Sequence, residues 1–363
     1  MARGQVEGLG VAPRLRLGDT GAETIVLPPQ TTHDGALDAL LEQLKARGHA
    51  RFAAAGHRIV HGGTQFADAV LIDDAVLAAM QALVPLAPLH QPHNLAGVRA
   101  VERAFPGLAQ VACFDTAFHR SQSEVHQRFA LPQAWHERGI RKYGFHGLSY
   151  ESIATQFALA APQLAQRRVV VAHLGNGASM CALQGGRSAA TTMSFSPLDG
   201  LPSGTRCGRI DAAAVLHLIA REGLTVAAAE ALLTRESGWL GLSGLSSDMR
   251  VLLGSPIPAA RFTIDHLVEQ VLRELAGLAA ALRGLDALVF TGGIGENAAE
   301  LRARVIDGAA WLGLQLDANA NAQGLGRITS AHSPVAGWVL RTDEESVIAR
   351  HTARVVQGIG GFA

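Results

Sequence analysis

The segment Thr-Gly-Gly-Ile-Gly-Glu-Asn at residues 291–297 constrains this chain more than any other feature of its sequence. It follows the apolar run Ala-Leu-Val-Phe at residues 287–290 and precedes a helical pattern, which is the order strand, glycine turn, helix. Glycine lets the backbone turn tightly and approach a ligand, and the N–H groups at the start of a helix attract an anion. The order therefore predicts an α/β protein with a phosphate-bearing ligand, although the motif alone fits a plain strand-to-helix turn equally well.

Composition excludes several classes of protein. The 363 residues suggest about two domains, and 48% hydrophobic residues can bury a large core. Lys plus Arg equals Asp plus Glu at 31 each, so we expect no nucleic-acid partner. Cys113, Cys181 and Cys207 are scattered and odd in number, which indicates a reducing cytoplasm. No run approaches the roughly 20 apolar residues of a membrane span, and we expect no membrane contact and no signal peptide.

Short strands and helices alternate along the whole chain, and this order predicts a two-domain α/β protein. We expect strands at residues 5–9, 14–17, 23–27, 58–60, 111–114, 169–173, 179–183, 187–191, 287–290 and 335–341. We expect helices at residues 37–46, 75–83, 94–105, 210–221, 262–283, 296–312 and 344–356.

Three more polar turns accompany the first one. Residues 173–179 hold Asn-Gly between two apolar runs, which predicts a β-hairpin with or without a ligand. Residues 204–209 hold two glycines and two arginines, which suit an anion or a solvated loop. Residues 243–250 hold Asp248, which could reach a ribose or simply cap a helix. The Walker A pattern is absent. Glycine turns from distant parts of a chain suit the actin-like nucleotide fold.

Several longer motifs occur in one family's order and cover nearly the whole chain. They are Gly-His-Arg-Ile-Val-His-Gly-Gly (56–63), Leu-Ala-Pro-Leu-His (86–90), Phe-Asp-Thr-Ala-Phe-His (114–119), Tyr-Gly-Phe-His-Gly (143–147), and the segments 173–179, 204–208, 243–250, 291–297 and 342–345. With these motifs the chain resembles the acetate kinases and their relatives, the propionate and butyrate kinases.

The resemblance implies a two-domain acetate and sugar kinase/actin-like fold with a nucleotide cleft. The first domain would comprise residues 1–117 and 343–363, and the second residues 118–342. The implied reaction is ATP + acetate = ADP + acetyl phosphate by direct in-line phosphoryl transfer. The implied cofactors are ATP/ADP and Mg²⁺, with Mn²⁺ as an alternative, in a cytoplasmic homodimer.

The resemblance also implies residue roles by matching position. Asp115, His146 and Arg206 would act at the transferring phosphoryl group. Arg58, His90 and Phe145 would hold the substrate, and Glu344 would help to hold Mg²⁺. The nucleotide would be bound by His173, Leu174, Gly175, Asn176, Gly177, Asp248, Met249, Arg250, Gly293, Ile294, Gly295, Glu296 and Asn297.

Elementary chemistry explains why arginine is needed. Acetate has a pKa of about 4–5 and is ionised at pH 7, so it needs no general base. The difficulty is bringing one anion onto another, which calls for positioning and charge cancellation. Arg58 and Arg206 are the best candidates because a guanidinium grips two oxygens at once.

Each of these residues also has a structural interpretation. Arg58 could be a strand-end charge, Asp115 a capping carboxylate, His146 a hydrogen-bonded core histidine and Glu344 an ordinary first-turn glutamate. His90 and His93 lack a nearby third ligand, so zinc is not expected.

The chain departs from the family's pattern at its start. The family's first strand and Asn-x-Gly-Ser-Ser-Ser-x-Lys turn have no counterpart before Gly4, which suggests a misplaced start codon, a trimmed chain or a natural loss. Leu148, Tyr150 and Arg209 also replace commoner Thr, His and Asp. One alternative to an acetate kinase is a propionate or butyrate kinase, whose activity on short carboxylates would overlap with that of an acetate kinase. The other is a nucleotide-binding protein that lacks turnover because the first strand is missing.

Overall fold

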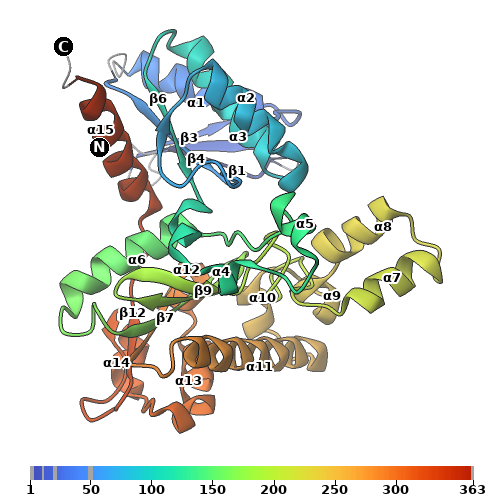
Figure 1. Ribbon diagram of the computed structural model, residues 1–363, viewed down its shortest axis with the longest axis vertical. Helices are drawn as coiled ribbons and strands as arrows, with labels where there is room; N and C mark the ends of the chain where they lie inside the picture. Colours follow the sequence, from blue (N-terminus) through green and yellow to red (C-terminus); the bar gives the residue numbers. More distant parts are fainter. Residues whose placement is uncertain (1–3, 10–11, 19–22, 48–51, 361–363) are drawn as a thin grey trace. The chain divides into compact units, whose positions relative to one another are not determined.

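The computed structural model describes residues 4–9, 12–18, 23–47 and 52–360. The chain forms two compact units, one of residues 1–114 and 348–363 and one of residues 115–347 (Figure 1). The chain passes from the first unit to the second at the end of strand β6 (Gln110–Phe114) and returns within helix α15 (Glu344–Gly360). No helix among the described residues is long and apolar enough to cross a membrane.

The first unit contains two three-stranded sheets in its described part. The antiparallel sheet has the order β1-β2-β3, and the other has the order β4-β6-β5 with β4 and β6 parallel. The other elements of this unit are β1 (Gly4–Glu7), β2 (Arg14–Leu17), β3 (Glu23–Val26), α1 (His33–Ala46), β4 (Ala55–Ile59), β5 (Val70–Leu71), α2 (Asp74–Ala82), the 3₁₀ helix η1 (Val84–Leu86) and α3 (Gln91–Ala104).

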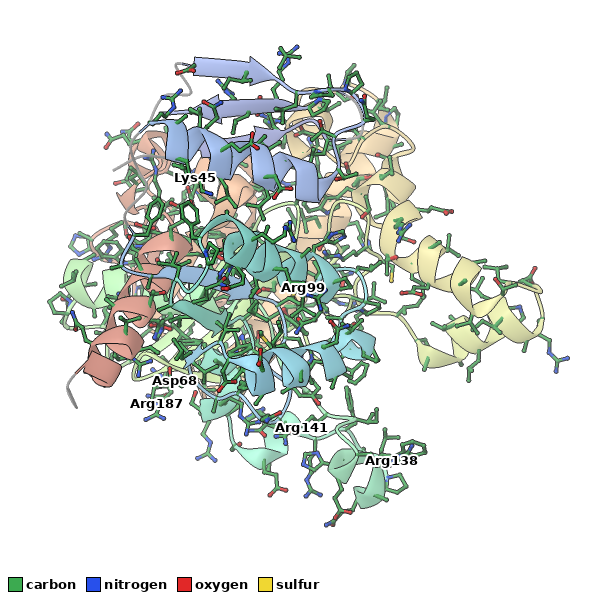
Figure 2. All side chains as sticks on the ribbon, turned by 90° about the horizontal axis from the view of Figure 1, so that it is seen from above. Lys45, Asp68, Arg99, Arg138, Arg141 and Arg187 are labelled. Carbon is green, nitrogen blue, oxygen red and sulfur yellow. The ribbon has the colours of Figure 1, made fainter. Side chains whose placement is uncertain are left out.

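Helices α1 and α3 pack together through an apolar seam. Leu41, Ala100 and Val101 are buried in it. The ammonium nitrogen of Lys45 lies 4.8 Å from the centroid of the Phe105 ring at the end of this seam, and Figure 2 labels this lysine on α1. Helix α1 begins where the Thr32 hydroxyl accepts a hydrogen bond from the Gly35 N–H at 3.2 Å, which caps the helix.

The second unit is built on a six-stranded sheet with the order β11-β12-β10-β7-β8-β9. Strands β12, β10 and β7 are parallel, and the outer strands are antiparallel to their neighbours. The elements after β6 are η2 (Ala117–Ser121), α4 (Glu124–Gln127), α5 (Gln133–Glu137), α6 (Gly147–Ala160), β7 (Arg168–Leu174), β8 (Ala178–Gln184), β9 (Arg187–Thr191), α7 (Ala212–Ala220), α8 (Val226–Ala231), the π-helix η3 (Leu232–Glu236), α9 (Gly238–Ser243), α10 (Met249–Leu253), α11 (Pro258–Ala281), β10 (Ala287–Thr291), α12 (Gly292–Asn297), α13 (Ala299–Gly308), η4 (Ala310–Leu312), α14 (Ala318–Gln323), β11 (Gly326–Arg327) and β12 (Ala336–Val339).

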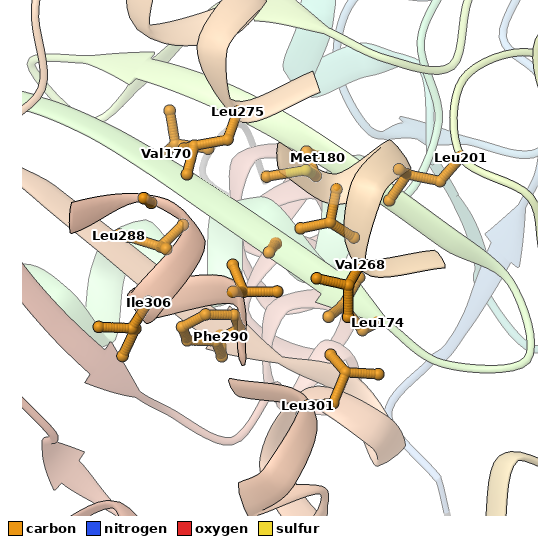
Figure 3. Packing of buried hydrophobic residues seen from close by; sticks show 14 of the residues in the cluster. Val170, Leu174, Met180, Leu201, Val268, Leu275, Leu288, Phe290, Leu301 and Ile306 are labelled. Atoms are coloured by element: carbon orange, nitrogen blue, oxygen red, sulfur yellow. The ribbon is translucent and has the colours of Figure 1, made fainter. Parts of the chain in front are cut away.

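Alternate residues of the central strands face two different apolar layers. In β7, Val170 and Ala172 belong to the layer with α11 and α13, whereas Val169 and Val171 belong to the layer with α6. This is the period-two alternation of a strand that is covered on both faces. Figure 3 shows the first layer, in which strand residues such as Phe290 pack against helix residues that include Leu275, Val268, Ile306 and Leu301.

Most of the strands that the sequence predicted are present in the structure. One predicted helix is wrong. The helix expected over residues 296–312 is three separate pieces, α12, α13 and η4, with a break at Ala298. Buried Arg302 explains the break, because its guanidinium donates to the carbonyl oxygens of Gly295 and Glu296, both at 2.9 Å. These carbonyls are therefore satisfied by a side chain instead of by a continuing helix.

Candidate active site

A cavity of about 810 Å³ lies in the second unit where three polar turns meet. The β7–β8 turn, the start of α10 and helix α12 each contribute to its walls. The residues that line it are Gly175, Asn176, Trp239, Ser247, Asp248, Met249, Arg250, Leu253, Gly293, Ile294, Asn297 and Ala298. The structure thus brings together eight residues that the sequence analysis assigned to the nucleotide, whereas His173, Leu174, Gly177, Gly295 and Glu296 are not in this lining.

The β7–β8 turn is held by backbone hydrogen bonds. The Gly175 N–H donates to the Gly177 carbonyl at 3.2 Å, and the Gly204 N–H donates to the Asn176 carbonyl at 3.0 Å. A Cβ atom on Gly204 would lie only 2.0 Å from Asn176 Oδ1, so a side chain here would displace the Asn176 amide. Buried Leu174 anchors the turn in the core, which is a structural role. The predicted hairpin is confirmed.

The β10–α12 turn approaches the hairpin turn closely. Gly292 has φ of +78°, and a Cβ atom there would lie 2.8 Å from the Leu174 carbonyl oxygen. A Cβ atom on Gly175 would lie 4.0 Å from the Gly293 nitrogen and 3.7 Å from His173 Nε2. The two glycine turns and the His173 ring therefore border one small region.

The Glu296 carboxylate braces this turn. Its Oε1 atom accepts from the Gly292 N–H at 3.1 Å and from the Thr342 N–H at 3.3 Å. The Asn297 amide donates to the Gly293 carbonyl at 2.8 Å. These contacts give Glu296 a structural role within its own motif. Arg302, which was not predicted as a site residue, supports the C-terminal end of α12 by donating to the Gly295 carbonyl.

Asp248 caps helix α10, as its structural interpretation predicted. Its carboxylate accepts from the Arg250 N–H at 2.9 Å and from Arg250 Nη2 at 2.6 Å. Hydrogen bonds from Arg250 lower the pKa of Asp248 below its ordinary value, so the carboxylate is ionised at neutral pH. Both side chains still border the cavity.

His146 and His173 form a pair of rings beside the hairpin turn. Their centroids are 4.4 Å apart. His146 Nδ1 lies 2.8 Å from the Ser179 hydroxyl, and His173 Nδ1 lies 2.8 Å from the Ser149 hydroxyl. His146 also has φ of +58°, a left-handed conformation that is costly for a residue with a Cβ atom. Each imidazole is thus fixed through Nδ1.

Arg206 joins the histidines at Gly177. The point that a Cβ atom on Gly177 would occupy lies 3.4 Å from His146 Nε2 and 3.7 Å from Arg206 Nη1. Arg206 Nη1 also donates to the Pro197 carbonyl at 3.5 Å. The structure therefore brings together two of the three residues that were expected to act at the phosphoryl group.

Asp115 is the third of them, and it is fully buried at the end of β6. Its carbonyl accepts from the Gly147 N–H at 2.9 Å, and a Cβ atom on Gly147 would lie 2.1 Å from that oxygen. Because Gly147 follows His146, this contact ties the backbone of Asp115 to the start of α6. The position agrees with the expectation that polar groups at strand C-termini form the sites of α/β sheets.

The loop that carries Phe145 and His146 is clamped by His119, which the sequence analysis did not single out as a site residue. His119 Nε2 donates to the Phe145 carbonyl at 2.9 Å, and Nδ1 lies 2.8 Å from the Ser188 hydroxyl. Burial lowers the pKa of His119 to about 4, so the ring is neutral at pH 7. A neutral ring can donate at one nitrogen and accept at the other, as this clamp requires.

The remaining expected site residues lie elsewhere in the chain. Arg58 is on β4 and exposed, and His90 precedes α3 and is half-buried; both belong to the first unit. Glu344 is the first residue of α15 and is half-buried. Within the described ranges, no group of three His, Cys, Asp or Glu side chains could hold a metal ion by itself.

Comparisons with known proteins identify the class and then the family. The fold is that of the acetate and sugar kinase/actin-like kinases. An acetate kinase from Porphyromonas gingivalis matches with a TM-score of 0.88 and 35% identity over 98% of this chain and 93% of its own. A propionate kinase from Francisella tularensis matches with a TM-score of 0.90 and 36% identity over the same shares, 98% and 93%.

The sequence comparison is more specific. The profile of the Acetokinase family matches residues 3–350, and the chain belongs to this family. An acetate kinase from Rhodopseudomonas palustris strain TIE-1 is 49% identical over 99% of this chain and 92% of its own length. One from Methylocella silvestris is 47% identical over 97% and 89%.

The His119 clamp predicts a pH dependence of stability. The folded pKa of about 4 is below the ordinary value of 6.5, so the unfolded chain binds more protons between these pH values. The contribution is complete above pH 6.5 and is lost as the pH falls toward 4. From pH 7 to pH 5 the loss is roughly 2 kcal/mol, at about 1.4 kcal/mol per pKa unit. His119→Gln should flatten the fall of melting temperature between pH 7 and pH 5.

The exposed His217 offers a control in the same unit. His217→Gln makes the same chemical change at the surface of this unit, away from the His119 clamp. Calorimetry at both pH values would measure these differences, and an unchanged slope in His119→Gln would show that His119 takes up its proton in the folded state.

Proposed function

We propose that this chain catalyses the reversible, ATP-dependent phosphorylation of acetate to acetyl phosphate. The observation that carries the proposal is the convergence of His146 Nε2 and Arg206 Nη1 on Gly177, with His173 Nε2 beside Gly175. The same glycine turn is part of the wall of the 810 Å³ cavity. Two nitrogen donors and a nucleotide-sized cavity at one turn are what transfer of a γ-phosphoryl group needs.

The chemistry follows from charge. Acetate is ionised at neutral pH, so its oxygen attacks phosphorus without a base, and the two anions must be shielded from each other. Arg206 supplies a permanent positive charge. The Ser179 hydroxyl can donate to His146 Nδ1, which leaves the proton on Nε2 as a donor toward a phosphoryl oxygen. In our proposal Asp115, which is buried beside the start of α6, orients the side chains of His146 and Arg206 and transfers no proton.

The nucleotide occupies the cavity in this proposal. Its phosphates lie at the glycine turns, and its adenosine lies between the α10 segment and α12. Gly175, Asn176, Gly293 and Asn297 form the phosphate end, together with His173, Leu174 and Gly177 of the hairpin. Asp248, Met249, Arg250 and Ile294 form the adenosine end, with Gly295 and Glu296 holding the shape of the turn.

The substrate and metal residues are proposed from their matching positions. We assign the carboxylate of acetate to Arg58, with His90 and Phe145. Proteins usually bind Mg²⁺ through one or two carboxylates, together with phosphate oxygens and water. A metal ion that arrives with ATP therefore needs no cluster of three protein ligands, and the described part of the chain holds none. Glu344 would help to hold it, and the bound metal would neutralise charge on the phosphates.

The proposal predicts which arginine controls turnover. The wild-type chain should form acetyl phosphate from acetate, ATP and Mg²⁺, measured as the hydroxamate. Arg206→Ala should lower the turnover number at least about a hundredfold, because a guanidinium on a transferring phosphoryl group contributes on the order of 10³–10⁵ in rate. That range corresponds to roughly 4–7 kcal/mol of barrier.

Arg209→Ala is the matched control from the same loop. The Arg209 side chain is 64% exposed and pairs with Glu274 at 2.9 Å, so its loss should leave turnover nearly normal. Near-normal turnover of Arg206→Ala, with the same melting temperature as the wild type, would remove Arg206 from the proposal. A wild-type chain that binds ATP without forming product would overturn the proposed reaction.

Gly177 offers a test of the site that leaves charge unchanged. A methyl group at this position meets His146 and Arg206 at ordinary contact distances of 3.4 and 3.7 Å, so the fold should tolerate Gly177→Ala. The methyl group takes the space in front of both donors, and we expect turnover to fall at least about tenfold. Gly277→Ala, in an open position of α11, is the control and should retain full turnover. Unchanged turnover in Gly177→Ala would contradict the placement of the phosphoryl group.

We further propose that the chain forms a homodimer through α7 and α8. Helix α7 is Ala-Ala-Ala-Val-Leu-His-Leu-Ile-Ala and has no buried residue among those described, and α8 lies beside it (Figure 1). Leu216 is 66% exposed and Val226 is 71% exposed. Exposed apolar side chains on neighbouring helices favour association, and a second copy fits because the resemblance implies a homodimer.

Light scattering after size-exclusion chromatography would test this surface. The wild type should have the mass of two chains, and Leu216→Glu should shift it toward one because a charge replaces apolar contact. Leu159→Glu, at a leucine of α6 that is 82% exposed, should leave the dimer intact. A dimer that survives Leu216→Glu would place the interface elsewhere.

A further inference from the structure

Tyr150 of α6 is fully buried and lies between the two contacts that hold the His146 loop. Its hydroxyl is hydrogen-bonded to the Ser179 hydroxyl, which in turn lies 2.8 Å from His146 Nδ1. Its ring lies edge-on to the His119 ring, with the centroids 5.7 Å apart. The Tyr150 N–H donates to the His146 carbonyl at 3.1 Å, so the two residues are one helical turn apart. The phenol, the serine hydroxyl and the imidazole therefore form a hydrogen-bonded row that ends at the site.

The two hydrogen bonds of this row have linked directions, because the Ser179 hydroxyl has only one proton to donate. If Tyr150 donates to Ser179, the Ser179 proton goes to His146 Nδ1, and a neutral imidazole carries its proton on Nε2. If Ser179 donates to Tyr150 instead, His146 must donate from Nδ1, and Nε2 has only a lone pair. The direction at Tyr150 therefore decides which nitrogen of His146 carries the proton.

Chemistry and the neighbouring contacts favour donation from Tyr150. A phenol is a stronger acid than an aliphatic alcohol, so it is the better donor of the two hydroxyls. The Thr191 hydroxyl, which also interacts with the phenol, donates to the Met180 carbonyl at 2.9 Å and so has no proton left for Tyr150. Burial raises the pKa of Tyr150 well above its ordinary value, so the phenol keeps its own proton at neutral pH.

A proton on His146 Nε2 is the state that a phosphoryl oxygen requires. Nε2 lies 3.4 Å from the point that a Cβ atom on Gly177 would occupy, with Arg206 Nη1 on the same point. A negatively charged oxygen in front of them accepts from an N–H and is repelled by a lone pair. We propose that Tyr150 is a positioning residue for phosphoryl transfer, whose hydroxyl fixes, through Ser179, the tautomer of His146 that donates from Nε2. This inference rests on the proposed function, in which His146 faces the transferring group.

Tyr150→Phe isolates the hydroxyl, because the ring that packs against His119 is retained. Without the phenol, the Ser179 oxygen can accept from His146 Nδ1 as readily as its hydroxyl can donate to it, so the tautomer is no longer fixed. The turnover number should fall about two- to tenfold, the range of one net hydrogen bond. The KM values for ATP and acetate should change little, because a fully buried phenol does not contact them.

Ser179→Ala provides the background that separates positioning from packing. Without the Ser179 hydroxyl, the phenol has no hydrogen-bonded route to His146, so adding Tyr150→Phe to Ser179→Ala should cause little further loss of turnover. An equal fold-loss from Tyr150→Phe in both backgrounds would mean that Tyr150 acts through packing, and it would overturn the inference. Melting temperatures of the wild type, the two single variants and the double variant would show that each protein is folded.

A direct measurement of the tautomer needs no substrate and begins with the wild-type chain. With ¹⁵N-labelled histidine at about pH 8, where an imidazole is ordinarily neutral, the His146 signals should show the proton on Nε2. In Tyr150→Phe this proton should move in part to Nδ1. Tyr143→Phe removes the hydroxyl of the only other tyrosine, which donates to the Gly139 carbonyl at 2.8 Å, and should leave the His146 tautomer unchanged.

Two results would sink the assignment of Tyr150: a wild-type His146 with its proton on Nδ1, or an unchanged tautomer in Tyr150→Phe. A wild type that has the expected tautomer but forms no acetyl phosphate would count against the proposed function and would leave the tautomer assignment standing.

Discussion

The parallel pairing of β7 with β10 is the constraint on which the site depends. The strands pair in register from Val169 beside Ala287 to His173 beside Thr291. Each strand is followed at once by glycines, Gly175 in one case and Gly292 in the other. Because parallel strands end at the same edge of a sheet, two turns that are more than a hundred residues apart in sequence emerge side by side. The cavity forms where they meet.

Close approach of backbone segments then sets the positions of the side chains. A Cβ atom on Gly292, Gly204 or Gly147 would collide with a backbone or amide oxygen. Glycine at these positions lets the hairpin turn, the Arg206 loop and the start of α6 share one small volume. Serine hydroxyls hold the two histidines through Nδ1. The donors are therefore fixed before any ligand arrives, which is the condition for electrostatic stabilisation of a transition state.

The sequence predicted the sheet and the glycine turns well because both depend on local patterns. The apolar runs that became β7 and β10 and the Asn-Gly hairpin needed no knowledge of distant contacts. The division of the helix expected over residues 296–312 was missed because its cause is tertiary: buried Arg302 binds two carbonyls of α12 and also Asn321. A helical period cannot show where a side chain will satisfy the end of a helix.

The candidate site was predictable where a residue's chemistry is evident from its motif. His146 and Arg206 do meet at one turn. Trp239 and Leu253 were missed because an apolar residue has no signature of a ligand wall until the chain is folded, whereas Ser247 lay within the expected polar turn 243–250 without being singled out. His119 had a visible signal, its place in the motif 114–119, but its clamping role depends on Ser188 of β9.

Some departures from local rules lie at the proposed site. His146 has a left-handed backbone conformation, and Gly292 has a positive φ that is inexpensive because glycine has no side chain. Trp239 has a buried indole N–H without a partner among the described residues. Arg283 also has a positive φ, but it follows the end of α11, where left-handed residues commonly stop a helix. The sheet core under the site follows the alternating pattern closely. The buried layers around β7 and β10 therefore support an edge that carries a left-handed histidine and a close approach of two backbone turns.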